Sequence, residues 1–161
     1  MVRRMAQVYA TAHVRVRLAS VESLNLPVLL DANVGASDGT MTPDLEKLYA
    51  CRQSASPLEP VAYLVRSLIP SADGCSTHPP NVPAVVISQQ ATKWTLAHEI
   101  GHLLALAHVD DDHNLMTGNG TENITNPPPI LVSEQTERMH ASPFVQRMTV
   151  ASKTQIRRVK M

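Results

Sequence analysis

This chain has few aromatic residues, few cysteines and no net charge. Phe, Trp and Tyr make up only 3% of the residues, which argues against a surface that stacks nucleic-acid bases or encloses a cofactor in aromatic rings. The 14 basic and 14 acidic side chains give a formal charge of zero, so bulk charge does not bind the chain to nucleic acid or to an anionic membrane. The only cysteines, Cys51 and Cys75, are too few for a four-cysteine zinc site or a disulfide-dense scaffold.

Long apolar runs are also missing. The chain has no run of about 18 apolar residues, the length that spans a bilayer. The opening residues lack the apolar core and cleavage site of a secretory signal. We therefore expect a cytoplasmic protein or a domain cut from a longer chain. Apolar residues still make up 43% of the chain, which is enough for the core of one domain over residues 1–161.

The first half of the chain predicts mainly strands. Residues 8–18 alternate between apolar and polar side chains, the pattern of a half-buried strand. Thr42-Pro43-Asp44 has a cap residue, an N1 proline and an early acid, so a helix should begin there and end near Cys51 or Gln53. Residues 61–69 and 84–88 are apolar runs typical of buried strands. We expect this sheet region to cover about residues 1–88.

The second half predicts helices separated by a loop. Leu96, Ile100, Leu103 and Ala107 form an apolar stripe at helical spacing. Residues 114–129 contain glycines and three consecutive prolines, which favour a loop. A second helix is expected over 133–148 with a break at Pro143, and the basic tail over 151–161 should be frayed. Together these elements predict an α+β fold, in which a mixed, twisted sheet packs against a central helix and a further helix follows the loop.

Four of the seven histidines lie in one short stretch, which contains His98-Glu99-Ile100-Gly101-His102. His98 and His102 are four residues apart, so on a helix their imidazoles lie one turn apart on the same face. Two imidazoles so placed can bind one Zn²⁺. Glu99 is next to the first histidine and is placed to accept the proton of an activated water.

Chance is a poor explanation for this motif. A random chain of this composition would contain His-Glu-x-x-His about once in eighty tries, and a further histidine six residues on lowers that to well under one in a thousand. The alternative is a helix whose histidines merely occupy a polar face. That alternative requires the motif and the residues after it to be coincidental.

The stretch HEIGHLLALAH followed by VDDDHNLM resembles the metzincin zinc peptidases, whose pattern is H-E-x-x-H-x-x-G-x-x-H with a later methionine turn. The spacing from His108 to Met116 is similar to that of the matrixin branch. The resemblance covers about residues 84–148. It implies that His98, His102 and His108 bind zinc and that Glu99 is the catalytic base. It also implies that Met116 lies in a turn beneath the metal and that Asp111 fixes the loop after the third ligand.

Ala105 occupies the glycine position of that pattern. If the helix ran on, His108 would lie about 240° round from His102 and face away from the metal. A left-handed turn at Ala105 is therefore expected, although it costs alanine on the order of 1 kcal/mol. Other third ligands remain open, namely Asp110, Asp111, Asp112 and His113. We expect Asp111 to be a structural carboxylate and its two acidic neighbours to be solvated.

These observations predict a zinc-dependent endopeptidase with a protein or peptide substrate and no nucleic-acid or membrane partner, most simply a monomer. Two alternatives remain open: a zinc-containing binding protein that does not cut its partner, and a zinc hydrolase of a non-peptide amide. Cys75 could block the metal as a thiolate, but a bridge to Cys51 or a pair of inert thiols is the simpler expectation.

Overall fold

The computed structural model describes residues 1–36, 39–52 and 55–146. These residues form an α+β fold, as the sequence predicts. Its helices are α1 (Val2–Thr11), α2 (Pro43–Ala50), α3 (Thr95–Leu103) and α4 (Ser133–Ala141), with short 3₁₀ turns at Pro27–Leu29 and Thr121–Asn123. Its strands are β1 (Asp31–Asn33), β2 (Val61–Val65), β3 (Ser67–Ile69), β4 (Gly74–Cys75) and β5 (Ala84–Ser88). None of the helices among these residues is long and apolar enough to cross a bilayer.

The strands form two small sheets. β1 pairs with β3 in parallel, and the other sheet has the order β2-β5-β4. β5 is parallel to β2 and antiparallel to β4, so this sheet is mixed, as expected. Every residue of β5 is buried, because it is the central strand and has a packed layer on each face.

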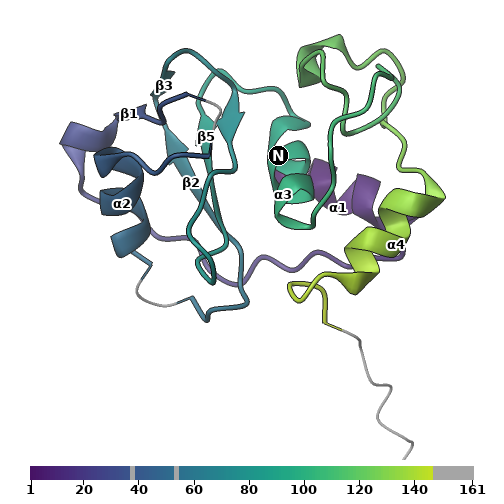
Figure 1. Ribbon diagram of the computed structural model, residues 1–161, viewed down its shortest axis with the longest axis horizontal. Helices are drawn as coiled ribbons and strands as arrows, with labels where there is room; N and C mark the ends of the chain where they lie inside the picture. Colours follow the sequence, from purple (N-terminus) through teal and green to yellow (C-terminus); the bar gives the residue numbers. More distant parts are fainter. Residues whose placement is uncertain (37–38, 53–54, 147–161) are drawn as a thin grey trace, which may run out of the picture.

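Alternation along β5 divides the interior into two apolar clusters. Val85 and Ile87 pack with α1 and α3, whereas Ala84 and Val86 pack with α2 and the strand residues around it. Figure 1 shows the result: α2 lies outside the sheets on one side, and α3, α1 and α4 lie on the other. α3 therefore packs next to the central strand, with α1 behind it.

The strand predicted over residues 8–18 is wrong. Val2–Thr11 is helical, and the chain from 14 to 26 is irregular. Met5, Val8, Tyr9 and Ala12 have helical spacing as well, and all four are buried in the cluster around α3. The Tyr9 hydroxyl donates to the Ala97 carbonyl of α3 at 2.8 Å. Tertiary packing selects the helical period over the alternating one, since both periods are present in the sequence.

The run 61–69 is two strands instead of one. β2 ends at Val65, and β3 begins at Ser67 in the other sheet. β2 is also less buried than predicted: Tyr63 and Val65 are buried, but Leu64 is 73% exposed. Leu64 pairs with Ile87 of β5, but it is not part of the cluster that Ile87 forms with α1 and α3. One face of β2 is therefore uncovered, and burial along the strand alternates.

For the second half of the chain, the predictions differ from the structure mainly in where the helices end. α3 stops at Leu103, so Ala107 lies beyond the helix and is exposed instead of joining its apolar stripe. The predicted loop after residue 114 is present, with one 3₁₀ turn inside it. α4 ends at Ala141, two residues before Pro143, as the proline requires. The rest of the predicted helix beyond residue 146 and the basic tail lie outside the described residues.

Candidate metal centre

α3 places the first two histidines in the interior. Thr95–Gly101 and Leu103 are all buried, and His102 is half-buried. Leu96, Ala97 and Ile100 pack in the cluster shared with α1 and β5, and this packing fixes the rotation of the helix. His98 and His102 therefore point together from one face of a helix that is held on its other faces.

The helix ends in a left-handed turn that returns the chain to this face. Ala105 has φ = 64°, which confirms the turn expected there. The Leu106 N–H donates to the Gly101 carbonyl at 3.0 Å and the Ala105 N–H donates to the His102 carbonyl at 2.9 Å. This pair of bonds is a Schellman motif, normally built on glycine. The turn brings His108 back to the two histidines of the helix.

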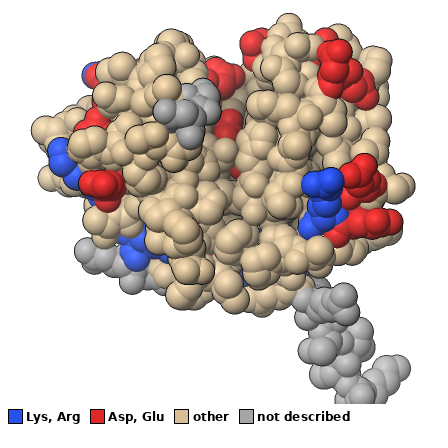
Figure 2. Space-filling model, viewed as in Figure 1, with Lys and Arg blue, Asp and Glu red and all other residues tan. Residues whose placement is uncertain are grey.

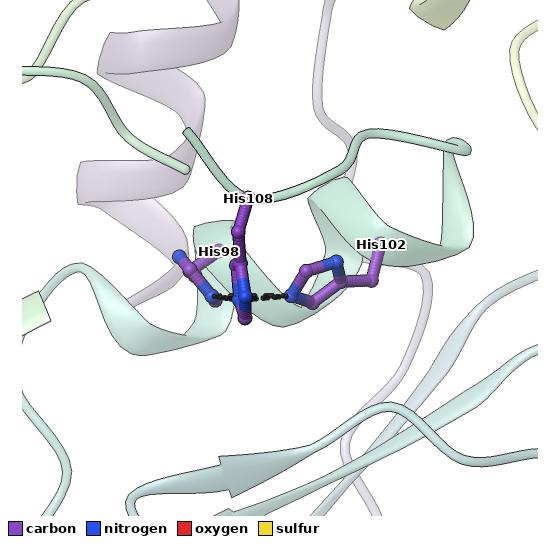
Figure 3. Close-up of side chains that lie close together, drawn as sticks. All are labelled: His98, His102 and His108. Carbon is purple, nitrogen blue, oxygen red and sulfur yellow. Dashed lines mark hydrogen bonds between the residues drawn. The ribbon is translucent and has the colours of Figure 1, made fainter. Parts of the chain in front are cut away.

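The three imidazoles converge on one point (Figure 3). The Nε2 atom of His102 is 3.1 Å from that of His98 and 3.1 Å from that of His108, and the third side of the triangle is 3.2 Å. Three nitrogens at this spacing can all lie about 2.0–2.1 Å from a single ion above their plane, the distance at which imidazole binds zinc. The cluster can hold a metal ion.

The protonation states of His98 and His102 also suit the binding of a cation. His98 Nδ1 donates to the Leu115 carbonyl at 2.8 Å, and His102 Nδ1 donates to the Leu106 carbonyl at 2.9 Å. A carbonyl only accepts, so each Nδ1 carries the proton and each Nε2 presents a lone pair. Burial lowers the pKa of His98 to about 4 and also lowers that of His102. Two converging lone pairs on neutral rings repel each other unless a cation lies between them.

Glu99, the residue that follows His98, is also buried. Its side chain lies against β4, where a Cβ atom on Gly74 would be 2.6 Å from both Cγ and Oε1 of the glutamate. Burial raises the pKa of Glu99 to about 7, and the Asp73 carboxylate adds to the rise while the Ser76 side chain opposes it. Figure 2 shows a hollow between the sheet half and the helix half of the molecule, with acidic atoms inside it.

Met116 lies beneath α3. It is fully buried, and a Cβ atom on Gly101 would be 2.6 Å from its sulfur. Its carbonyl accepts from the Val109 N–H at 2.9 Å, which ties it to the loop carrying His108. The chain next to the second and third histidines thus contacts one buried residue, Gly101 at the side chain of Met116 and Val109 at its carbonyl.

The acidic loop after His108 differs from the expectation. Asp111 Oδ1 accepts only the His113 N–H, at 2.9 Å. Asp112, expected to be solvated, accepts from the Thr117 hydroxyl at 2.7 Å and from the Asn119 amide at 3.1 Å, and these bonds lower its pKa. Asp112 therefore makes more of the side-chain bonds that hold this loop.

The other candidate third ligands do not join the histidines. His113 is exposed and pairs with the Thr125 hydroxyl at 3.0 Å. Within the described part of the chain, His98, His102 and His108 form the one cluster of three potential ligands. Cys51 and Cys75 are both free thiols, and neither belongs to that cluster.

Comparison with protein-family models, with curated proteins and with solved structures gives no match for this chain. The likeness to metzincins therefore rests on the motif, and function has to be argued from the site.

Several residues that support the site were not predicted from the sequence. Gly74 leaves room for Glu99, and Gly101 leaves room for Met116. Asn114 and Gln135 form a buried amide pair next to the Leu115 carbonyl. The sequence offers one weak signal among these, since Gln135 is the third residue of a predicted helix, where Gln often caps the first turn.

Proposed function

We propose that this protein is a zinc-dependent hydrolase of peptide bonds. The observation that carries the proposal is the convergence of three Nε2 atoms, 3.1–3.2 Å apart, together with a buried carboxyl group on the residue that follows His98. Catalytic zinc sites use three protein ligands and leave a fourth position for water or substrate. Neutral imidazoles suit zinc, and copper, iron and nickel as well, so the metal is a part of the proposal to be measured.

Glu99 is the proposed general base. A zinc ion at such a site polarises a carbonyl and lowers the pKa of water. The Glu99 carboxylate would accept a proton from the attacking water and later donate it to the amine nitrogen that leaves. A carboxyl group whose burial raises its pKa to about 7 is suited to both transfers near neutral pH.

The edge of the sheet favours a peptide as the substrate. β4 is the last strand in the order β2-β5-β4, and no other strand among the described residues pairs with its outer edge. β4 also borders Glu99 at Gly74. An extended peptide can add to such an edge through main-chain hydrogen bonds, which would hold its backbone next to the proposed base.

The test combines metal analysis with cleavage of a peptide library. We expect the purified protein to contain one zinc ion and to cleave peptides, and Glu99→Gln to keep the ion while losing at least about 100-fold in kcat, the usual effect of general acid–base catalysis. His102→Ala should lose the ion as well as the activity.

The matched control is Gln89→Ala, an exposed residue just after β5, which should change neither readout. A protein that holds zinc but cleaves no peptide would overturn the proposed activity. Cleavage of acylated small molecules in its place would indicate a non-peptide amide as the substrate, and no cleavage of either would indicate a binding protein.

A further inference from the structure

We propose that Asn114 and Gln135 are positioning residues for the metal site. Their paired side-chain amides fix the peptide unit between Leu115 and Met116, and the carbonyl of that unit orients His98. This inference rests on the proposed metal site. It assigns to α4, which contributes no ligand, a specific effect on the first histidine.

The peptide unit between Leu115 and Met116 is held at both ends. Its carbonyl accepts from His98 Nδ1 at 2.8 Å, and its N–H, which belongs to Met116, donates to Asn114 Oδ1 at 2.8 Å. The carbonyl and the N–H of one peptide lie in one rigid plane. The Asn114 side chain therefore sets the direction from which the carbonyl meets the imidazole.

The Asn114 amide is itself fixed by Gln135. Asn114 Nδ2 donates to Gln135 Oε1 at 3.0 Å, and Gln135 Nε2 donates back to Asn114 Oδ1 at 3.0 Å. Gln135 Oε1 also accepts from the Val132 N–H at the start of α4, at 2.9 Å. Asn114 is 1% exposed and Gln135 is 6% exposed, so each oxygen accepts two bonds in a place with little access to water.

These bonds form a continuous path from α4 to the metal ligand. The donors run from His98 toward α4: His98 Nδ1 donates to the Leu115 carbonyl, the Met116 N–H donates to Asn114, and Asn114 Nδ2 donates to Gln135. The Leu115 carbonyl can only accept, which keeps the proton on His98 Nδ1. Hydrogen bonds in such a chain polarise one another. A partner that fixes the tautomer and the ring orientation of a ligating histidine also raises its basicity as a ligand.

His102 provides the contrast. Its Nδ1 donates to the Leu106 carbonyl at 2.9 Å, and the Leu106 N–H is bonded to the Gly101 carbonyl of the same helix end. Apart from His102 itself, no side chain in the described part of the chain bonds to the backbone of Leu106. The support of His98 instead depends on two side chains, one of them on a helix that follows later in the sequence, so substitution can remove it.

The experiment measures zinc binding to metal-free protein in competition with a chromophoric chelator. Asn114→Ala and Gln135→Met each interrupt the path, the second with little change in side-chain length. The control is Met139→Ala, which removes a fully buried side chain of α4 and should destabilise the fold without touching the path. A second readout is the NMR signal of the His98 Nδ1–H proton in the metal-free protein.

We expect each amide variant to bind zinc about 10-fold more weakly, the usual effect of removing the partner of a metal ligand, and Met139→Ala to bind as the wild type does. The His98 proton should exchange faster with solvent in both amide variants. The double variant should lose little more than Asn114→Ala alone, because the two amides act as a unit.

Unchanged affinity in both amide variants would overturn the inference, and so would an equal loss in Met139→Ala, because affinity would then follow fold stability. If the wild type takes up no zinc, the proposed function fails. The exchange rate of the His98 Nδ1–H proton is then the one test of the positioning role. An unchanged rate in the amide variants would overturn that role.

Discussion

Close backbone contacts at single residues shape the proposed site. Gly74 and Gly101 lack the Cβ atom that would meet Glu99 and Met116, so the glycines let a carboxyl group and a thioether lie against the main chain. Ala105 is the opposite case, because it adopts φ = 64° despite its Cβ. Left-handed backbone costs an L-residue other than glycine roughly 1–2 kcal/mol. The chain bears this cost where the turn returns His108 to α3.

Replacing Ala105 by glycine should stabilise the protein. Glycine relieves the left-handed strain, but it also gives the unfolded chain more conformational freedom. That freedom lowers the free energy of unfolding by about 0.4–1 kcal/mol. The net gain in the free energy of unfolding should be about 0.5–1 kcal/mol, which raises Tm by about 1–4 °C in a domain of this size. Calorimetry of metal-free protein measures this shift.

The matched control is Ala107→Gly, which is also exposed and outside the helix but has no positive φ. It should lower Tm or leave it unchanged. A loss of stability in Ala105→Gly equal to that in Ala107→Gly would mean that the turn is not strained.

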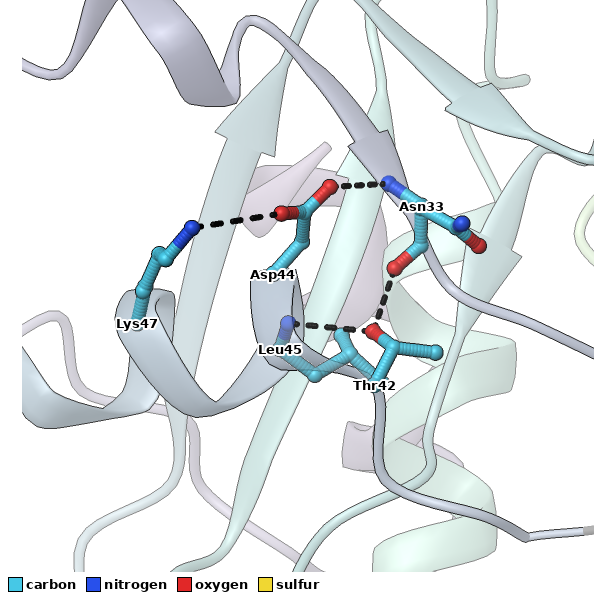
Figure 4. Close-up of polar contacts among 5 residues, drawn as sticks. All are labelled: Asn33, Thr42, Asp44, Leu45 and Lys47. Atoms are coloured by element: carbon cyan, nitrogen blue, oxygen red, sulfur yellow. Dashed lines mark hydrogen bonds and ion pairs between the residues drawn. The ribbon is translucent and has the colours of Figure 1, made fainter.

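Among the elements, α2 shows how a predicted boundary is built. Thr42 Oγ1 accepts from the Leu45 N–H at 3.2 Å and donates to the Asn33 carbonyl at 2.5 Å. Asp44 accepts from the Asn33 N–H at 3.0 Å, so the first turn of α2 is bonded to the last residue of β1 (Figure 4). The sequence predicts the cap from Thr42-Pro43, but the partner strand is known only from the fold.

Thr42→Ala should lower the free energy of unfolding by about 1 kcal/mol, the usual effect of losing an N-cap. Thr42→Ser keeps the hydroxyl and should recover most of this loss. The control is Lys47→Ala, which removes an exposed ion pair of 3.9 Å with Asp44 and should change stability by less than about 0.5 kcal/mol. Urea denaturation compares the three variants, and equal losses in Thr42→Ala and Lys47→Ala would contradict the capping role.

At the scale of the whole molecule, the proposed metal joins two segments. His98 and His102 belong to α3, whereas His108 belongs to the chain that follows the turn at Ala105. An ion bound by all three histidines links that segment to the helix. The three ligands come together in this way only in the folded state. Metal binding should therefore be linked to global stability.

Zinc should raise the Tm of metal-free protein. Free zinc at 100 times its Kd adds about 2.7 kcal/mol to the free energy of unfolding. His108→Ala should lose most of this gain, because the two remaining ligands lie on one helix. His113→Ala, which removes an exposed histidine outside the cluster, should keep it. Calorimetry with and without a chelator measures the shift, and an equal gain in both variants would mean that His108 does not bind the metal.

The sequence alone determined the local features of this protein. The spacing of His98, Glu99 and His102 predicts their shared helix, the apolar run 84–88 predicts a buried strand, and geometry requires a turn near Ala105. These features depend on interactions between residues close in sequence, so a local pattern can predict them.

Only the tertiary structure decided the rest. Residues 2–11 form a helix because Tyr9 and its neighbours pack on α3, although residues 8–18 also fit a strand. The position of Glu99 depends on a glycine 25 residues earlier in the sequence, and the support of His98 depends on Gln135 from a later helix. No local pattern can predict such contacts, because the fold brings together residues that are distant in sequence.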